Sequence, residues 1–145
     1  MRKDAARTGL PDSSVDLFVT DPPFTDEIQY LELSQMAASW LGMRLDFTNE
    51  IVVNTNQGKN KGRYMQLLGD SFAEMYRILK VGHYAVIMFH DEDVRTVTAV
   101  QSEIESAGFK VRAVNHEVMH QRNVGDRDTE MGKRLTIFTC RKPGC

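Results

Sequence analysis

The chain has 145 residues, of which 41% are hydrophobic and 26% are charged, and its formal net charge is −2. This length and balance are typical of one soluble globular domain with a core of its own. The small net charge excludes a general attraction to nucleic acid, so a DNA contact would need a local basic patch.

Two further features bear on the compartment. No apolar run approaches the length of a membrane span, and the amino terminus lacks the pattern of a signal peptide. The two cysteines, Cys140 and Cys145, lie close together near the carboxyl terminus and are not spaced as a disulfide framework. We therefore expect a cytoplasmic protein with no membrane contact.

Residues 1–14 are expected to form an entry loop. The apolar run Leu17–Val19 then predicts a short strand, which ends at two consecutive prolines. Proline cannot donate to a sheet ladder, and the residue before a proline avoids the helical region. The stretch Asp21–Phe24 therefore predicts a stiff elbow at the carboxyl end of the strand, where ligands bind in open α/β sheets.

A helix is predicted from Asp26 to Leu41, because apolar residues recur there on one helical face. That face comprises Leu33, Met36, Ala37, Trp40 and Leu41. Aromatic residues at helical spacing usually pack in a core, so we expect Trp40 to be buried and Gly42 to end the helix. Residues 43–63 predict a mobile, solvated connector. Alternatively, the connector closes over a substrate and contacts phosphates through Lys59, Lys61 and Arg63.

A clear helix is predicted from Tyr64 to Lys80, with an apolar stripe and a stop at Gly82. The apolar run 84–89 predicts a strand that is covered on both faces, with His90 at its carboxyl end. A helix over 94–107, ended by Gly108, and two strands over 109–114 and 135–140 complete the chain. This alternation indicates an α/β fold whose last two strands form an antiparallel edge.

The elbow Asp21–Phe24 after an apolar strand resembles the signature of S-adenosylmethionine-dependent amino-methyltransferases of DNA. Other stretches are similar to further parts of the family pattern: Leu10–Asp16, Tyr30–Ser34, Ser71–Lys80 with Gly82, and Phe89-His90. The resemblance extends from residue 4 to residue 115. It implies a Rossmann-like class I methyltransferase sheet, S-adenosylmethionine as cofactor and DNA as partner.

The reaction implied is methyl transfer to an exocyclic amine of DNA, adenine N6 or cytosine N4. That nitrogen is a poor nucleophile because its lone pair is delocalised into the ring. Two acceptors held against its N–H groups would free the lone pair as the methyl group transfers. Asp21 and the carbonyl of Pro22 are the expected acceptors, within an elbow that Pro23 completes. Phe24 is expected to stack on a base flipped out of the duplex.

Two more residues are assigned to this site. In the family that the sequence resembles, the acid at Asp4 lies near the cofactor. His90 follows the strand at 84–89 and is expected to line the pocket, because it stands at the ligand-binding end of that strand.

The chain lacks the glycine-rich loop that holds the cofactor in this fold, because none of its ten glycines follows an apolar strand in that arrangement. It also lacks a recognisable target-recognition region. C5-cytosine methylation is excluded, since neither cysteine lies near the elbow. We therefore expect residues 1–145 to form a partial catalytic domain, the C-terminal half of the sheet, that requires a separate cofactor-binding half. An inactive remnant or a nucleic-acid-binding module is the alternative.

A competing motif occurs at 116–120, where His-Glu-Val-Met-His matches the H-E-x-x-H pattern of zinc metalloproteases. That chemistry requires a helix, which places the two histidines one turn apart. Here the motif follows a predicted strand, and Asp126 stands where a third histidine would be. We expect no metal site, and a metalloprotease is the distant alternative.

In the complete family fold, the strand around Leu17–Val19 has a neighbour on each side. Without the missing half, this strand would become a sheet edge with unpaired backbone groups and apolar side chains. Such an edge recruits another strand, and no proline or lysine interrupts the run. Because symmetric pairs are the commonest oligomers, the sequence predicts a homodimer whose interface contains Leu17–Val19.

Overall fold

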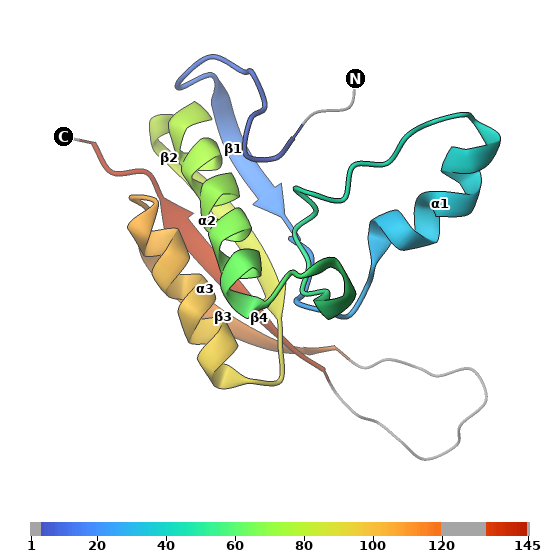
Figure 1. The fold of residues 1–145 in the computed structure, drawn as a ribbon. Helices are drawn as coiled ribbons and strands as arrows, with labels where there is room; N and C mark the ends of the chain where they lie inside the picture. The colour runs from blue at the N-terminus through green and yellow to red at the C-terminus, as the bar shows by residue number, and fades with distance from the viewer. Residues whose placement is uncertain (1–3, 120–132, 145) are drawn as a thin grey trace.

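The computed structural model describes residues 4–119 and 133–144. Its elements, in chain order, are β1 (Val15–Thr20), α1 (Tyr30–Trp40), the 3-10 turn η1 (Thr55–Gln57), α2 (Lys61–Ile78), β2 (Leu79–His90), α3 (Val94–Ser106), β3 (Lys110–Met119) and β4 (Lys133–Arg141) (Figure 1). The predicted order of strands and α-helices is confirmed. Within the described ranges, no helix has the length and apolarity that a membrane crossing needs.

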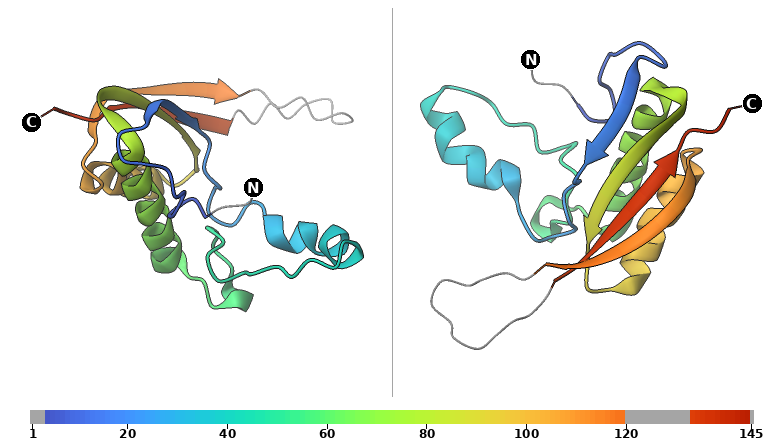
Figure 2. Two further views of the ribbon diagram at one scale, coloured as in Figure 1. Left: turned by 90° about the horizontal axis from the view of Figure 1, so that it is seen from above. Right: turned by 180° about the vertical axis from the view of Figure 1, so that it is seen from behind.

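The four strands form one sheet in the order β1-β2-β4-β3. β1 runs parallel to β2, whereas β4 is antiparallel to both of its neighbours, so the predicted antiparallel edge is confirmed. Figure 2 shows α2 and α3 on the same face of the sheet, with no described helix on the opposite face. β1, which leads into the elbow, is therefore an edge strand of the described sheet.

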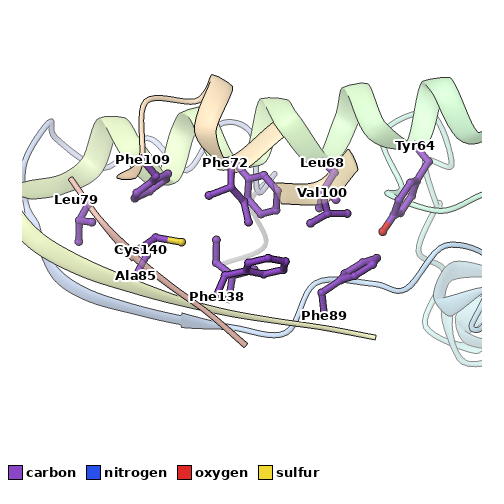
Figure 3. Close-up of a cluster of buried hydrophobic side chains, with 12 residues drawn as sticks. Tyr64, Leu68, Phe72, Leu79, Ala85, Phe89, Val100, Phe109, Phe138 and Cys140 are labelled. Carbon is purple, nitrogen blue, oxygen red and sulfur yellow. The ribbon is translucent and has the colours of Figure 1, made fainter. Parts of the chain in front are cut away.

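The core lies between this helix-covered face and the two helices (Figure 3). Alternate residues of β2 point to one face, so Ala85, Ile87 and Phe89 are fully buried there. Their partners from the other elements include Leu68, Phe72, Val100, Phe138 and Cys140. Burial raises the pKa of the Cys140 thiol to about 12, so this cysteine stays protonated and unreactive. Cys145 lies outside the described residues.

The prediction for the first helix is wrong in two respects. α1 begins at Tyr30 instead of Asp26, and the apolar face expected to be buried is exposed, with Trp40 84% accessible. α1 lies beyond the β1 edge, away from the other strands (Figures 1 and 2). The spacing of the apolar residues correctly indicated an amphipathic helix. That spacing does not say whether another element covers the apolar face.

The connector between α1 and α2 is shorter than predicted. The side chain of Asn60 accepts a hydrogen bond from the Arg63 amide (2.9 Å) and caps α2, which therefore begins at Lys61. Asn54 caps η1 in the same way and also pairs with Lys59 through backbone hydrogen bonds of 2.9 Å. Three residues of the expected 43–63 connector thus belong to α2, and the mobility of the rest stays a prediction.

Candidate active site

The elbow follows directly from the parallel pairing of β1 with β2. Thr20, the last residue of β1, lies beside Ile87, three residues before the end of β2. Parallel strands end at the same edge of a sheet, so Asp21 and His90 both lie at the carboxyl end of the sheet. Asp21 is exposed, Pro22 is buried, and Pro23 and Phe24 are half-buried.

Two contacts hold the elbow against the core. The hydroxyl of Tyr64, which is fully buried in α2, donates a hydrogen bond to the backbone carbonyl of Pro23 (2.7 Å). Burial raises the pKa of Tyr64 to about 12, so the hydroxyl keeps its proton at any ordinary pH. The ring of Phe24 meets Phe89 edge-to-face, with centroids 5.6 Å apart. The position of Asp21 is therefore set by residues of α2 and β2.

The backbone directly after the elbow is strained. Thr25 has a φ of +33°, a region that residues other than glycine rarely occupy. Its carbonyl accepts a hydrogen bond from the amide of Val53 (2.8 Å), which ties the elbow to the connector. Such conformations persist only where the surroundings impose them, and they concentrate at functional sites.

His90 links the elbow to β4, the strand next to β2. The side chain is 2% exposed, and Nδ1 lies 2.8 Å from the backbone carbonyl oxygen of Arg134, a contact that places the proton on Nδ1. Nε2 lies 3.5 Å from Oε1 of Glu27, and the imidazole ring also packs edge-to-face on Phe24 (5.9 Å). His90 therefore contacts the elbow as expected, but as a buried residue behind Phe24.

The electrostatics of Asp21 differ from those of an ordinary surface carboxylate. Partial burial raises its pKa, because desolvation disfavours the charged form. No lysine or arginine occurs in the sequence between Val15 and Met43, whereas five acids do. The carboxylate of Asp21 is thus a better proton acceptor than a fully solvated one, and it lies in an acidic stretch.

Solvent-accessible cavities include one beside the elbow and a larger one along α2. The smaller, about 250 Å³, is next to the elbow and is lined by Thr25, Asp26, Val53, Lys61, Asp91, Asp93 and Thr96. The larger, about 580 Å³, lies between the amino-terminal segment, the connector and α2, and Asp4 lines it. The carboxylate of Asp4 accepts hydrogen bonds from the amide of Ala6 (2.9 Å) and the side chain of Asn49 (3.3 Å). Asp4 and the elbow therefore border different cavities.

The three basic residues predicted to contact phosphates have different surroundings. Lys59 is buried, and its ammonium group donates to the backbone carbonyls of Phe47 and Glu50, so it stabilises the connector. Burial lowers the pKa of Lys59. Lys61 is half-exposed and lies 3.5 Å from Asp93, and Arg63 lines the larger cavity. Of the three, only Lys61 and Arg63 can reach a ligand.

The H-E-x-x-H motif does not have the geometry that a zinc protease needs. Residues 116–119 belong to β3, where side chains alternate between faces, and Nδ1 of His116 lies 3.2 Å from the hydroxyl of Thr136. His120 lies outside the described residues. No group of three metal-ligating side chains occurs in residues 4–119 and 133–144. The metalloprotease alternative requires a helix at this motif. The described part of the motif, residues 116–119, forms a strand instead, so that requirement is not met there.

Two contact residues were not predicted for the site. Tyr64 was recognised only as the start of a helix, although it stands four residues before Leu68 on the apolar stripe. A tyrosine on a core-facing stripe needs a partner for its hydroxyl, and that signal could have pointed to the elbow. The contact of Glu27 with His90 had no signal in the sequence, since it joins residues 63 positions apart.

The sheet order, with a parallel strand pair followed by an antiparallel edge and two helices on one face, is that of a class I methyltransferase fold. The chain aligns over 98% of its length with a candidate DNA modification methylase of Thermus thermophilus that was crystallised with S-adenosyl-L-methionine. That alignment covers 54% of the Thermus chain, at 19% identity and a TM-score of 0.60. The chain thus spans about half the length of this protein.

Two other structures show how widely the fold is used. A SAM-dependent methyltransferase of Methanosarcina mazei aligns over 97% of this chain and 65% of its own, with 12% identity and a TM-score of 0.54. The [4+2]-cyclase SpnF aligns over 99% and 56%, with 13% identity and the same TM-score. Comparison with models of protein families gives no match, and neither does comparison with curated proteins. The fold is thereby established, and the reaction must be argued from the site.

Proposed function

We propose that this chain supplies the catalytic elbow for methyl transfer from S-adenosylmethionine to an exocyclic amine of DNA, adenine N6 or cytosine N4. One observation carries the proposal. The carboxylate of Asp21 stands exposed at the carboxyl end of β1, on a proline elbow that Tyr64 and Phe89 hold in place. The resemblance of the Asp-Pro-Pro-Phe sequence and the class I fold support it independently.

In this mechanism the elbow acts on the amine. The carboxylate of Asp21 accepts a hydrogen bond from one N–H and the carbonyl of Pro22 from the other, so the nitrogen becomes pyramidal and its lone pair is freed. The hydrogen bond from Tyr64 engages the carbonyl of Pro23 and not that of Pro22. S-adenosylmethionine, when bound, would supply the methyl group to this lone pair, and Asp21 would accept the proton that the amine loses.

Phe24 has a narrower role than the sequence suggested. One part of its ring packs on Phe89 and His90, and the half-buried side chain leaves the remaining surface for a flipped base. His90 contacts the ring of Phe24, and Glu27 contacts His90. We assign them as positioning residues for Phe24.

The described residues supply some, but not all, of the groups that a cofactor site needs. S-adenosylmethionine supplies an electrophilic methyl group on a positively charged sulfur. Asp4 and Asn49 offer polar groups on a cavity of about 580 Å³, within the size range of small-molecule sites. However, no glycine lies between β1 and α1 or between β2 and α3, where a loop could approach a ligand closely. We therefore propose that a further polypeptide unit with a glycine-rich loop completes the cofactor site.

An inactive remnant is the second candidate, and the missing glycine-rich loop favours it. A module that only binds nucleic acid is less well supported, because the exposed surface around the elbow carries acids and no basic residue between Val15 and Met43. Phosphate contacts would have to come from Lys61 and Arg63, at the start of α2.

The decisive experiment compares Asp21→Ala with Glu92→Ala, a control at an exposed acid after β2. Each protein is incubated with duplex DNA and a large excess of S-adenosylmethionine, in the presence of a cofactor-binding partner unit, and methylated nucleosides are identified by mass spectrometry. We expect N6-methyladenine or N4-methylcytosine with the wild type and Glu92→Ala, and a loss with Asp21→Ala. Because Asp21 is exposed, its replacement should change the free energy of unfolding by no more than about 0.5 kcal/mol.

Three other results are informative. Methylation that survives in Asp21→Ala would contradict the assignment of the acceptor. A large loss of stability in that variant would make Asp21 a structural residue. Wild-type protein that methylates no nucleic acid, even with a cofactor-binding partner present, would favour the remnant.

A further inference from the structure

The connector between α1 and α2 contributes to both cavities described above. Asn49 and Ile51 line the larger cavity, which Asp4 also borders, and Val53 lines the smaller cavity beside the elbow. The proposed function puts the methyl donor at the first cavity and the methyl acceptor at the elbow. Because the two reactants must meet at a fixed separation, the position of residues 49–53 matters for the reaction.

A buried ion pair holds the connector together. The side chains of Lys59 and Glu50 are 7% and 8% exposed, and Nζ of Lys59 lies 3.8 Å from Oε2 of Glu50. Within the described residues that oxygen has no hydrogen-bond partner, so the ammonium group compensates its charge. The same ammonium group donates to the backbone carbonyls of Phe47 and Glu50, at 3.0 Å from the second. One cation thus ties residue 59 to residues 47 and 50.

Glu50 and Lys59 each have a second attachment. Oε1 of Glu50 accepts a hydrogen bond from the amide of Leu31, in the first turn of α1 (2.9 Å). Lys59 exchanges two backbone hydrogen bonds of 2.9 Å with Asn54. The segment from Glu50 to Asn54 is therefore fixed at both ends, by a helix at one end and by the backbone pair at the other.

This fixed segment carries Val53, which meets the strained residue after the elbow. The amide of Val53 donates to the carbonyl of Thr25 (2.8 Å), and the carbonyl of Val53 accepts from the side chain of Gln29 (3.2 Å). Thr25 has a φ of +33°, a conformation that its surroundings must impose. A continuous series of contacts thus joins the buried Lys59 to the elbow.

We propose that Lys59 and Glu50 are positioning residues for methyl transfer. They brace residues 49–53 and so keep the larger cavity and the elbow at the separation that the reaction needs, an inference that rests on the proposed function. Neither side chain touches a substrate. They act through the backbone, on Thr25 at one end of the segment and on the larger cavity at the other.

Two variants separate positioning from folding. Lys59→Met keeps the length of the side chain but leaves the carboxylate of Glu50 buried without a counterion, so it should also lose stability. The double variant Lys59→Met/Glu50→Gln removes both charges and should regain most of that stability. It cannot restore the bonds to the carbonyls of Phe47 and Glu50, so the brace stays broken. Arg44→Met is the matched control, because Arg44 is an exposed cation of the same connector.

Amide hydrogen exchange, followed by NMR, tests the brace without any reaction. We expect the amide of Val53 to exchange about tenfold faster or more in both Lys59 variants, because local opening no longer breaks the contacts of the ammonium group. The amide of Phe72, in the core of α2, should be unchanged in the double variant, and Arg44→Met should match the wild type throughout. A Val53 amide that stays protected in both Lys59 variants would overturn the proposal.

Methylation, measured with the cofactor-binding partner unit present, tests the consequence. The double variant should melt near the wild-type temperature and yet lose about tenfold or more in kcat, since a small misplacement of the reactants is costly. A kcat that recovers together with the stability would make Lys59 a merely structural residue and would overturn the proposal. If the wild type methylates nothing while the exchange results are as expected, the proposed function fails and the brace is still supported.

Discussion

At the scale of single residues, the elbow depends on a hydroxyl group that the reaction itself does not use. Tyr64 is fully buried, and its hydroxyl donates a hydrogen bond to the backbone carbonyl of Pro23 in the elbow. A carbonyl that loses such a partner within a protein interior keeps its desolvation cost. The stiffness of the two prolines and this single hydrogen bond together determine where Asp21 points.

Tyr64→Phe should therefore destabilise the protein by about 0.5–1.5 kcal/mol, the net contribution of a typical hydrogen bond, because the acceptor is half-buried. Tyr84→Phe is the control, since the ring of Tyr84 is 45% exposed on the uncovered face of the sheet, and it should stay within about 0.5 kcal/mol. Urea denaturation measures both. Equal effects of the two substitutions would show that the bond to Pro23 contributes nothing.

A second residue-scale feature is the ion pair that holds the amino-terminal segment on α2. The buried carboxylate of Glu74 accepts hydrogen bonds from Arg77 (2.8 and 2.9 Å) and from the hydroxyl of Thr8 (2.6 Å). The bonds from Arg77, followed by that from Thr8, lower the pKa of Glu74 to about 2. The bonds to Thr8 fix the amino-terminal segment that also contains Asp4.

The pH dependence follows from the sign of that shift. The folded-state pKa of Glu74 lies below its ordinary value of 4.5, so its stabilisation is complete above that value and is lost as pH falls toward about 2. Glu74→Gln should lower the unfolding free energy at neutral pH and flatten its decline between these two pH values. Denaturation series at several pH values test this. An unchanged slope in Glu74→Gln would contradict it.

At the scale of the elements, glycine marked the ends of α1 and α3 correctly, but the stop predicted at Gly82 is wrong, because α2 ends at Ile78 and Gly82 lies within β2 with a φ of +81°. Gly42 follows α1 with a φ of +63°, and Gly108 follows α3 with a φ of +106°. A side chain at Gly42 would meet nothing within 4 Å, whereas a Cβ at Gly108 would lie 2.9 Å from the ring of Tyr76. The two positions thus share backbone strain and differ in packing.

Gly42→Ala should cost about 1–2 kcal/mol from backbone strain alone. Gly108→Ala should cost about 1–3 kcal/mol more, because the ring of Tyr76 and the core behind it must move. Thermal and chemical denaturation of the two variants give the comparison. A Gly108→Ala variant as stable as Gly42→Ala would mean that Tyr76 adapts without cost.

At the scale of the whole molecule, the described sheet has one covered face, and its elbow strand is an edge. The fold matches class I methyltransferase structures over nearly its full length, but it spans about half of the Thermus chain. If the chain acts as proposed, it holds the substrate-side groups, and a further unit supplies the close backbone approach to the cofactor.

Titration of S-adenosylmethionine into residues 1–145 should accordingly give weak binding, in the millimolar range or above, by isothermal calorimetry. Any residual binding should depend on Asp4, so Asp4→Ala should abolish it, while Glu92→Ala should not. Micromolar binding by this chain alone would contradict the requirement for a further unit. It would leave the assignment of Asp21 untouched, since that rests on the elbow.

The sequence by itself determined the order of the elements, the elbow and most of the core. The helical patterns of α2 and α3 and the apolar run of β2 mark segments that pack in the core. The run in β2 predicted cover on both faces, however, and only the face of Ala85, Ile87 and Phe89 is covered by described helices. Two prolines restrict the backbone wherever they stand, so the elbow at Asp21–Phe24 needed no tertiary information.

Only the tertiary structure decided which surfaces are covered and which charges are engaged. Trp40 has the spacing of a core residue, yet no described element reaches it. Lys59 lies in a stretch whose composition is that of a solvated loop. Its ammonium group nevertheless donates hydrogen bonds to the backbone carbonyls of Phe47 and Glu50, twelve and nine residues earlier in the chain. Likewise, Glu27 and His90 meet only because β1 and β2 end at the same edge. A side chain's partner depends on distances between elements, and no local pattern encodes those distances.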